Sequence, residues 1–253
     1  MLVILSVIPP LAIVFAVNKY CGTERCYIRR FVLIFLIAGL LIAAAAMFGS
    51  DFLTRGARTL LGSGFLFVLV SNFITVALFE ESLKYIVLRW RFVKRDPFTE
   101  PLYAIALSVT VSMGFAFYEQ MVYTLGEGLI TVILRAILSV PGHTGHAILM
   151  GMLLHLTAKS AASGDMAGKR KFLRLALLVP ALTHGTYDFI VGLYRLYGSD
   201  LFILLLVAFT AGLLYYTIRL LRRVKHDSRG NSGGPDTAAI TDDHNDIPEV
   251  FYE

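Results

Sequence analysis

The sequence has few charged residues and very little cysteine. Asp, Glu, Lys and Arg make up 16% of its 253 residues and hydrophobic residues make up 57%, whereas soluble proteins average about 25% charged and about 45–50% apolar residues. The two cysteines, Cys21 and Cys26, cannot staple a fold of this size, and one such pair is not a zinc-ribbon framework. The composition therefore excludes an ordinary soluble domain and predicts an integral membrane protein.

Several common functional motifs are also absent from the sequence. It has no phosphate-cradling glycine loop, no Ser/His/Asp order of the α/β-hydrolase type and no H-E-x-x-H zincin motif. Lys and Arg flank the apolar runs instead of forming a patch on a soluble face, so we expect no nucleic-acid partner.

Seven apolar segments predict the fold. A helix needs about 20 mostly apolar residues to cross the hydrocarbon core. The sequence therefore predicts an all-α, polytopic membrane helix bundle with about seven transmembrane helices, in one domain over residues 1–224. From 225 to 253 the chain is acidic and poor in apolar residues, which predicts a disordered cytoplasmic tail. The expected spans are about 2–17, 31–49, 62–88, 102–125, 128–157, 172–194 and 201–221.

The distribution of Lys and Arg predicts how the chain is oriented. The connections 18–30, 89–100 and 158–171, together with the tail, hold 16 of these residues, and the opposite connections hold 3. Positively charged loops stay in the cytoplasm. With seven spans, this bias places the N-terminus outside the cell membrane and the C-terminus in the cytoplasm.

Ionisable residues inside the predicted spans indicate a functional site. A charged side chain at membrane depth costs several kcal/mol, so such residues are usually functional. The third to sixth spans carry nine of them, whereas the first, second and seventh carry almost none, which predicts one polar site built by four successive spans. The nine residues are Glu80, Glu81, Lys84, Glu119, Arg135, His143, His146, His184 and Asp188.

Helical spacing suggests how some of these side chains pair. Glu80 and Lys84 are four residues apart and share a helix face, while Glu81 points about 100° further round. We therefore expect Lys84 to neutralise Glu80 and to leave a second carboxylate for proton transfer. His184 and Asp188 are one turn apart, so the carboxylate can fix the tautomer of the imidazole.

The fourth and fifth spans add two further expectations. Phe115, Glu119 and Tyr123 share one face, which allows Tyr123 to hydrogen-bond the carboxylate and Phe115 to shield it. Pro141–Gly142 is expected to open the helical hydrogen bonds just before His143 and to make room for a ligand. The expected helix ends leave Glu119 about 10 Å from Glu80 and its neighbour in membrane depth.

Two hydrolytic chemistries fit these residues. In the first, His143, His184 and Glu119 are the candidate ligands of Zn²⁺, and Glu80 or Glu81 activates water. The second needs no metal, because one of the paired glutamates activates water while the histidines and backbone donors stabilise the oxyanion. The residues alone leave both open.

Together the motifs resemble those of the PrsW-type intramembrane proteases, relatives of the CAAX prenyl endopeptidases and of bacteriocin-processing enzymes. The resemblance spans about residues 60–195. It rests on Glu80-Glu81-x-x-Lys84, Phe115-x3-Glu119-x3-Tyr123, Arg135-x3-Ser139 leading into Pro141-Gly142-His143, and His184-x3-Asp188. The sequence differs from the motifs of these families at two positions. Glu119 stands where the wider superfamily has a histidine. His146 lies outside the pattern. Three residues from His143, it is either a supporting residue of the site on the same face or a helix–helix contact.

The resemblance implies hydrolysis of a peptide bond in or next to the transmembrane segment of a membrane protein. The best known prokaryotic role is the first cut in a single-span anti-sigma factor, on the extracytoplasmic side. It also implies catalytic roles for Glu80, Glu81, Glu119, His143 and His184, with Asp188 as a partner, and supporting roles for Lys84, Phe115, Tyr123, Arg135 and Ser139.

The alternative function is a proton- or cation-coupled transporter, since intramembrane Glu, His and Asp residues also line ion pathways. Transporters often show matching halves with broken helices in corresponding positions. Here the polar residues crowd into one block, which favours the protease. A scaffold would leave the buried charges unexplained. The expected partners are the lipid bilayer and a single-span substrate.

Overall fold

The computed structural model describes residues 2–22, 26–94, 100–126 and 128–231, and over these residues all regular secondary structure is helical, which confirms the predicted all-α class. Two short segments, η1 and η2, are π-helical. The elements are α1 (Leu2–Cys21), α2 (Cys26–Leu61), α3 (Phe65–Val70), η1 (Ser71–Leu78), α4 (Phe79–Lys94), α5 (Pro101–Gly126), α6 (Leu129–Leu134), η2 (Arg135–Ser139), α7 (Val140–Ala162), α8 (Met166–Tyr197) and α9 (Leu201–Asn231).

Among the described residues, six helical segments are long and apolar enough to cross a membrane, and α1 contributes a shorter apolar helix, Ser6–Cys21. The prediction of a polytopic membrane bundle is confirmed. Several helices are longer than their apolar cores. In particular, α9 continues to Asn231, beyond the start of the predicted tail at 225, and the remainder of that tail lies outside the described residues.

Two of the membrane-crossing helices contain π-helical turns. The segments α3, η1 and α4 form one continuous helix, as do α6, η2 and α7. The helical hydrogen bonds do change near Pro141–Gly142, as expected. The change is the π-turn η2, which ends two residues before the proline, and the helix continues. The side-chain amide of Gln120 donates to the carbonyl of Val132 in this region, at 2.9 Å. Such π-turns are frequent at functional sites, and here each one precedes a site residue by a few positions.

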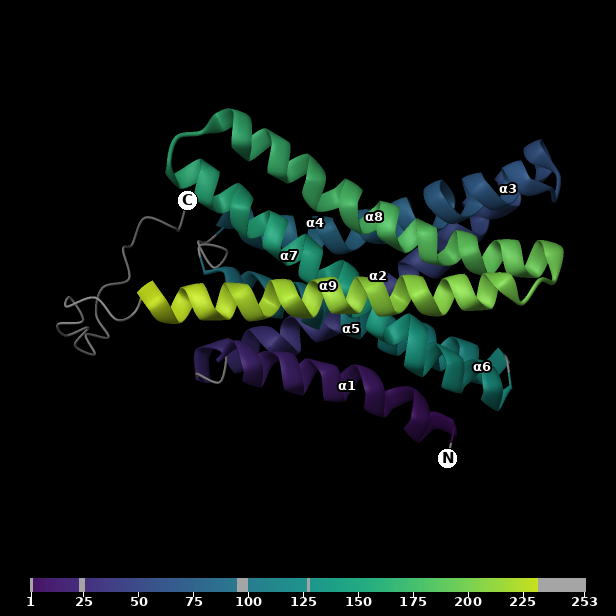
Figure 1. Ribbon diagram of the computed structural model, residues 1–253, viewed down its shortest axis with the longest axis horizontal. Coiled ribbons are helices and arrows are strands. Elements are labelled where there is room, and N and C mark those ends of the chain that lie inside the picture. The colour runs from purple at the N-terminus through teal and green to yellow at the C-terminus, as the bar shows by residue number, and fades with distance from the viewer. Residues whose placement is uncertain (1, 23–25, 95–99, 127, 232–253) are drawn as a thin grey trace.

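Helix α5 occupies the centre of the bundle (Figure 1). Every residue from Ala104 to Ala116 is buried, and α1, α2 and α7 pack against it. Helix α8 lies against α7 and against η1. The apolar core therefore surrounds α5. Of the other helices that carry predicted site residues, α4 and α7 pack against α5, and α8 packs against α4 and α7.

Two glycines allow α2 and α5 to touch. A Cβ atom on Gly39 would lie 2.0 Å from the carbonyl oxygen of Val111, and one on Gly114 would lie 2.1 Å from that of Leu36. Only a residue without a side chain fits such a backbone contact, which is a common way for membrane helices to pack closely. The contact fixes the position of α5, and with it the site residues that follow Gly114.

We expect Gly39→Ala to destabilise the protein by about 1–3 kcal/mol, because overpacking forces the two backbones apart. Thermal unfolding of the purified protein in detergent measures the change. Gly56→Ala in the same helix is the matched control, because a Cβ atom there meets nothing within 4 Å. The control should be neutral or slightly stabilising, and equal effects of the two substitutions would contradict the close contact.

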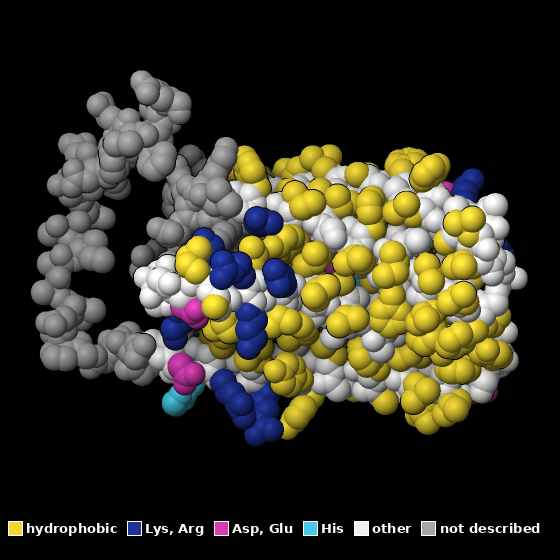
Figure 2. Space-filling model, turned by 90° about the horizontal axis from the view of Figure 1, so that it is seen from above, with side chains coloured by type: hydrophobic (Ala, Val, Ile, Leu, Met, Phe, Trp, Pro, Cys, Tyr) yellow, Lys and Arg dark blue, Asp and Glu magenta, His cyan; other side chains and the backbone are white. Residues whose placement is uncertain are grey.

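Positive charge gathers at one end of the bundle. Figure 2 shows Lys and Arg toward the end where α9 finishes, while apolar side chains cover much of the rest of the visible face. Helices α1, α4, α7 and α9 end there, and α2, α5 and α8 begin there. The charge asymmetry counted along the sequence is thus an asymmetry in space.

Candidate active site

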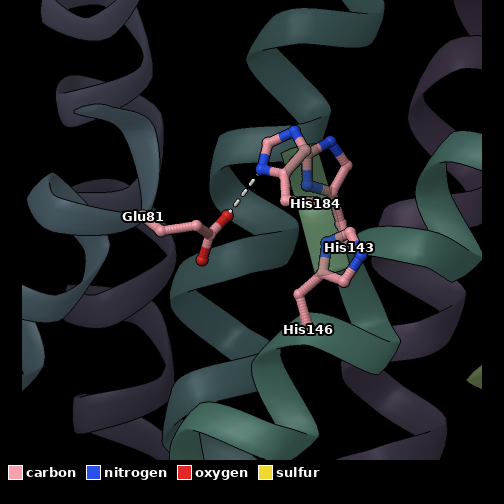
Figure 3. Close-up of side chains that lie close together, drawn as sticks. All are labelled: Glu81, His143, His146 and His184. Atoms are coloured by element: carbon pink, nitrogen blue, oxygen red, sulfur yellow. Dashed lines mark hydrogen bonds and ion pairs between the residues drawn. The ribbon is translucent and has the colours of Figure 1, made fainter. Parts of the chain in front are cut away.

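Four ionisable side chains from α4, α7 and α8 converge in the interior, where Glu81, His143, His146 and His184 lie close together (Figure 3). One nitrogen or carboxylate oxygen from each residue lies within 4.8 Å of those of the other three. All four are buried, with at most 5% of each residue exposed. We call these four residues the central cluster.

The lengths of the helices explain why these residues meet. Glu81 stands next to the midpoint of the continuous helix 65–94, and His143 and His146 stand near the middle of the helix 129–162. His184 likewise lies near the middle of α8. Helices of similar length that cross side by side bring their midpoints to one depth, so the cluster forms at the centre of the membrane-spanning bundle.

Lys84 pairs with Glu81. Its Nζ donates to Oε1 of Glu81 at 2.6 Å, and both side chains are buried. The same Glu81 oxygen lies 2.9 Å from Nδ1 of His184. This corrects the expected pairing of Lys84 with Glu80. Residues three and four positions apart are both neighbours on a helix, and the structure uses the three-residue spacing.

Glu80 is the carboxylate that Lys84 does not neutralise. It is 6% exposed, and its Oε2 has no hydrogen-bond partner. The same oxygen lies 4.0 Å from Nε2 of His184. One glutamate of the pair is therefore held by a cation, and the other has an uncommitted oxygen beside the central cluster.

Two further carboxylates contact His143 and His184 from outside the central cluster. Glu119 lies 2.9 Å from Nε2 of His143, and Asp188 lies 3.2 Å from Nε2 of His184. The second oxygen of Glu119 pairs with Arg135 at 2.8 Å. Histidines that bind metals usually donate their other ring nitrogen to a carboxylate in this way, so these contacts orient both imidazoles toward the central cluster.

The aromatic residues of the motifs take different positions from those expected. The guanidinium of Arg135 stacks over the ring of Tyr123 at 3.8 Å, so Tyr123 supports the ion pair through its face. Phe115 lies under Lys84, with Nζ 4.1 Å from its ring centroid. Ser139 is buried at the end of η2, one turn before His143.

The central cluster fits a metal ion. Both ring nitrogens of His146, and Nδ1 of His143, are buried without a hydrogen-bond partner, which is costly for polar atoms in an apolar interior. Imidazole nitrogens and a carboxylate oxygen are the ligands that Zn²⁺ takes in proteins. The residues that could hold it are Glu81, His143, His146 and His184.

The candidate ligand set thus differs from the one proposed from the sequence. His143 and His184 belong to both sets, but Glu81 and His146 lie with them, and Glu119 is in the outer position between His143 and Arg135. The sequence named His146 as a supporting residue, and its three-residue spacing from His143 is the signal that could have placed it among the candidate ligands.

A polytopic helix bundle with a buried cluster of imidazoles and carboxylates has the groups that a membrane-embedded hydrolase needs. The family described as "PrsW family intramembrane metalloprotease" matches residues 28–215. The chain therefore belongs to the PrsW family of intramembrane proteases.

Individual relatives support this assignment. The chain is 30% identical over 197 residues to Protease PrsW of Clostridioides difficile (strain 630), a match that covers 75% of this chain and 79% of that protein. It is 37% identical over 130 residues to Protease PrsW of Bacillus subtilis (strain 168), covering 51% and 56%. The Halalkalibacterium halodurans protein of the same name is 28% identical over 205 residues, covering 81% and 86%.

No solved structure matches the chain. The comparisons give no support to the transporter alternative.

Proposed function

We propose that this protein cuts a single-span membrane protein in or next to its transmembrane segment, with Zn²⁺ held by the central cluster. The observation that carries the proposal is the cluster itself, in which three imidazoles and a carboxylate offer ligand atoms within 4.8 Å of one another beside the uncommitted oxygen of Glu80. The comparisons supply the reaction class, peptide hydrolysis.

Each residue around the cluster has a distinct task in this proposal. When bound, the metal supplies a Lewis acid that polarises the peptide carbonyl and activates water. Glu80 takes the proton of the attacking water and returns it to the nitrogen of the leaving peptide. Lys84 keeps Glu81 charged, while Glu119 and Asp188 keep the imidazoles of His143 and His184 turned inward.

The polar side chains outside the cluster support access from the extracytoplasmic side. The side chains of Glu119, Arg135 and Asp188 are 15%, 17% and 23% exposed, more than any member of the cluster. In helix order they lie toward the end opposite the Lys- and Arg-rich end. With the cationic end in the cytoplasm, water and a locally unwound substrate enter from outside. The first substrate to test is a single-span anti-sigma factor, the class that the family resemblance implies.

The proposal is tested by cleavage of a single-span substrate by the purified full-length protein. We expect about one equivalent of zinc per chain, loss of cleavage after chelation and its return when zinc is added. His146→Ala should weaken zinc affinity by at least about 100-fold, because it removes a direct ligand, and even loss of an outer partner costs about 10–100-fold. Elemental analysis and competition with a zinc-binding dye measure these effects.

His155→Ala is the matched control, because it removes a histidine from the same helix at a position outside the central cluster. It should leave zinc affinity unchanged. Cleavage that survives complete removal of the metal would leave the hydrolytic role standing and exclude the zinc. Failure to cut any single-span substrate, with one zinc bound, would instead contradict the proposed substrate class.

A further inference from the structure

A stripe of cations and leucines follows the first half of α8. Arg170, Lys171 and Arg174 lie on one side of the helix, and Leu175 and Leu178 continue the same side toward its middle. With Ala167 these residues, all on α8, border an open surface depression of about 420 Å³. The three cations are exposed, and we call this surface the α8 basic groove.

The groove crosses the boundary of the hydrocarbon core. Taking the midpoint of α8 as the membrane centre, at 1.5 Å per residue, Arg170 lies about 17 Å from the centre and Arg174 about 11 Å. The hydrocarbon core extends about 15 Å on each side of the centre. Leu175 and Leu178 lie deeper than Arg174. The groove is therefore basic at the level of lipid phosphates and apolar at the level of the acyl chains.

The cations of the groove lack acidic partners in the part of the chain that the structure describes, where no ion pair involves any of the three. Asp165, at the start of α8, serves as the helix cap and accepts from the backbone N–H of Gly168 at 2.8 Å. Arg170 and Arg174 are four residues apart, where like charges repel.

An anion between the cations would relieve both their repulsion and the cost of a charge at the hydrocarbon edge. Helical side chains lean toward the N-terminus, so Arg174 reaches back toward Arg170 and Lys171 and toward the phosphate level. Arginine recognises phosphate through paired hydrogen bonds. The three side chains can therefore converge on one phosphate group.

We propose that the α8 basic groove binds the headgroup of an anionic phospholipid, with one acyl chain along Leu175 and Leu178. Clusters of Lys and Arg at the cytoplasmic end of a membrane helix attract anionic lipids. The apolar half of the groove favours a lipid over a free anion or an acidic peptide, neither of which would use the leucines. The assignment to the cytoplasmic leaflet rests on the proposed orientation, but the lipid binding does not depend on the protease activity.

Lipid binding by the purified full-length protein in detergent tests the proposal. The probes are phosphatidylglycerol and phosphatidylcholine with identical acyl chains, counted as bound lipids by native mass spectrometry over a titration. We expect phosphatidylglycerol to bind about tenfold more tightly. The triple variant Arg170→Gln/Lys171→Gln/Arg174→Gln should lose that tenfold preference, because it removes the positive charges that attract the anionic headgroup.

A second triple variant, Lys159→Gln/Arg222→Gln/Arg223→Gln, is the matched control, because it removes three exposed cations from the same end of the bundle. It should change the preference by less than about threefold. Equal losses in the two variants would show that the positive charge of this whole end of the bundle, and not the groove, attracts the lipid. That result would overturn the proposal. Competition by inorganic phosphate as strong as that of the lipid would overturn the lipid assignment.

The acidic tail is the other candidate occupant, since residues 232–253 carry six acidic residues and no Lys or Arg. A chain ending at Asn231 should bind phosphatidylglycerol as tightly as the full chain. Truncation could instead tighten phosphatidylglycerol binding about tenfold, and do so only while the three groove cations are present. That result would identify the tail as the occupant of the groove and overturn the proposal.

Discussion

Replacing Glu80 by glutamine is expected to lower kcat for peptide hydrolysis by about 10²–10⁴, the range that general acid–base catalysis contributes. Glutamine keeps the shape of the side chain but cannot accept the proton of the attacking water. Because Oε2 of Glu80 has no hydrogen-bond partner, an amide at this position breaks no bond of that oxygen. Zinc content and thermal stability should therefore stay at the wild-type level.

Glu81→Gln separates the two roles of the glutamate pair. Glu81 accepts from Lys84 and contacts His184, so its replacement should reduce metal affinity and stability together with the rate. Single-turnover cleavage, elemental analysis and thermal unfolding of both variants distinguish a proton-transfer residue from a ligand. A wild-type rate for Glu80→Gln would exclude Glu80 as the base, and loss of zinc from it would assign Glu80 to the metal instead.

Class and fold could be read from the sequence because they depend on summed hydrophobicity. A run of apolar residues must be covered by lipid or protein whatever its neighbours do, so a succession of membrane helices follows from the apolar runs. Of the seven expected spans, six are helices long enough to cross, and the first is the shorter helix Ser6–Cys21. The residues at which the helices end cannot be read from the apolar runs in the same way. The helix that carries Glu80 and Glu81 runs to Lys94, six residues past the expected end at 88, since polar residues continue a helix beyond the hydrocarbon core.

That extension accounts for part of the expected depth mismatch in the site. It places Glu81 near the middle of its helix, whereas Glu119 stands about 8 Å past the midpoint of α5. The side chain of Glu119 therefore meets His143 from the outer side and pairs with Arg135. Depth in the membrane determines which carboxylate joins the central cluster, and depth depends on helix ends that apolar runs do not define.

Rotation of the helices about their own axes was equally inaccessible to the sequence. His146 is about 60° away from His143 around α7, so either both or only one can face α8. The structure turns both inward, with the rings of His146 and His184 stacked at 5.2 Å. The motif spacing thus predicted that four spans meet, while packing decided which side chains point at one another.

Lys84 gives the largest expected effect on stability. Its side chain is 2% exposed, and its ammonium group lies 2.6 Å from Glu81 and over the ring of Phe115. Breaking a buried ion pair by removing one partner costs about 3–5 kcal/mol, because it leaves the other charge buried without compensation. We therefore expect Lys84→Met to destabilise the protein by about this amount, as measured by unfolding in mixed micelles, and to abolish cleavage.

The exposed pair between Arg55 and Asp51 is the matched control. Its two groups are 2.7 Å apart, a contact nearly as close as that of Lys84 with Glu81, but their side chains are 78% and 57% exposed. Arg55→Met should change the free energy of unfolding by less than about 1 kcal/mol, because solvent screens such a pair. If Lys84→Met were no more destabilising than Arg55→Met, the carboxylate of Glu81 could not depend on Lys84 for its charge.

The double variant Glu81→Gln/Lys84→Met distinguishes the effect of the ion pair on stability from its role in cleavage. Removing both charges leaves no unpaired ion, so the double variant should recover about 1–3 kcal/mol relative to the sum of the single variants. Cleavage should not recover, because the missing carboxylate is also one of the proposed metal ligands. Recovered stability without recovered activity would show that the enzyme keeps this buried pair for its chemistry, since an apolar replacement would hold the helices together as well.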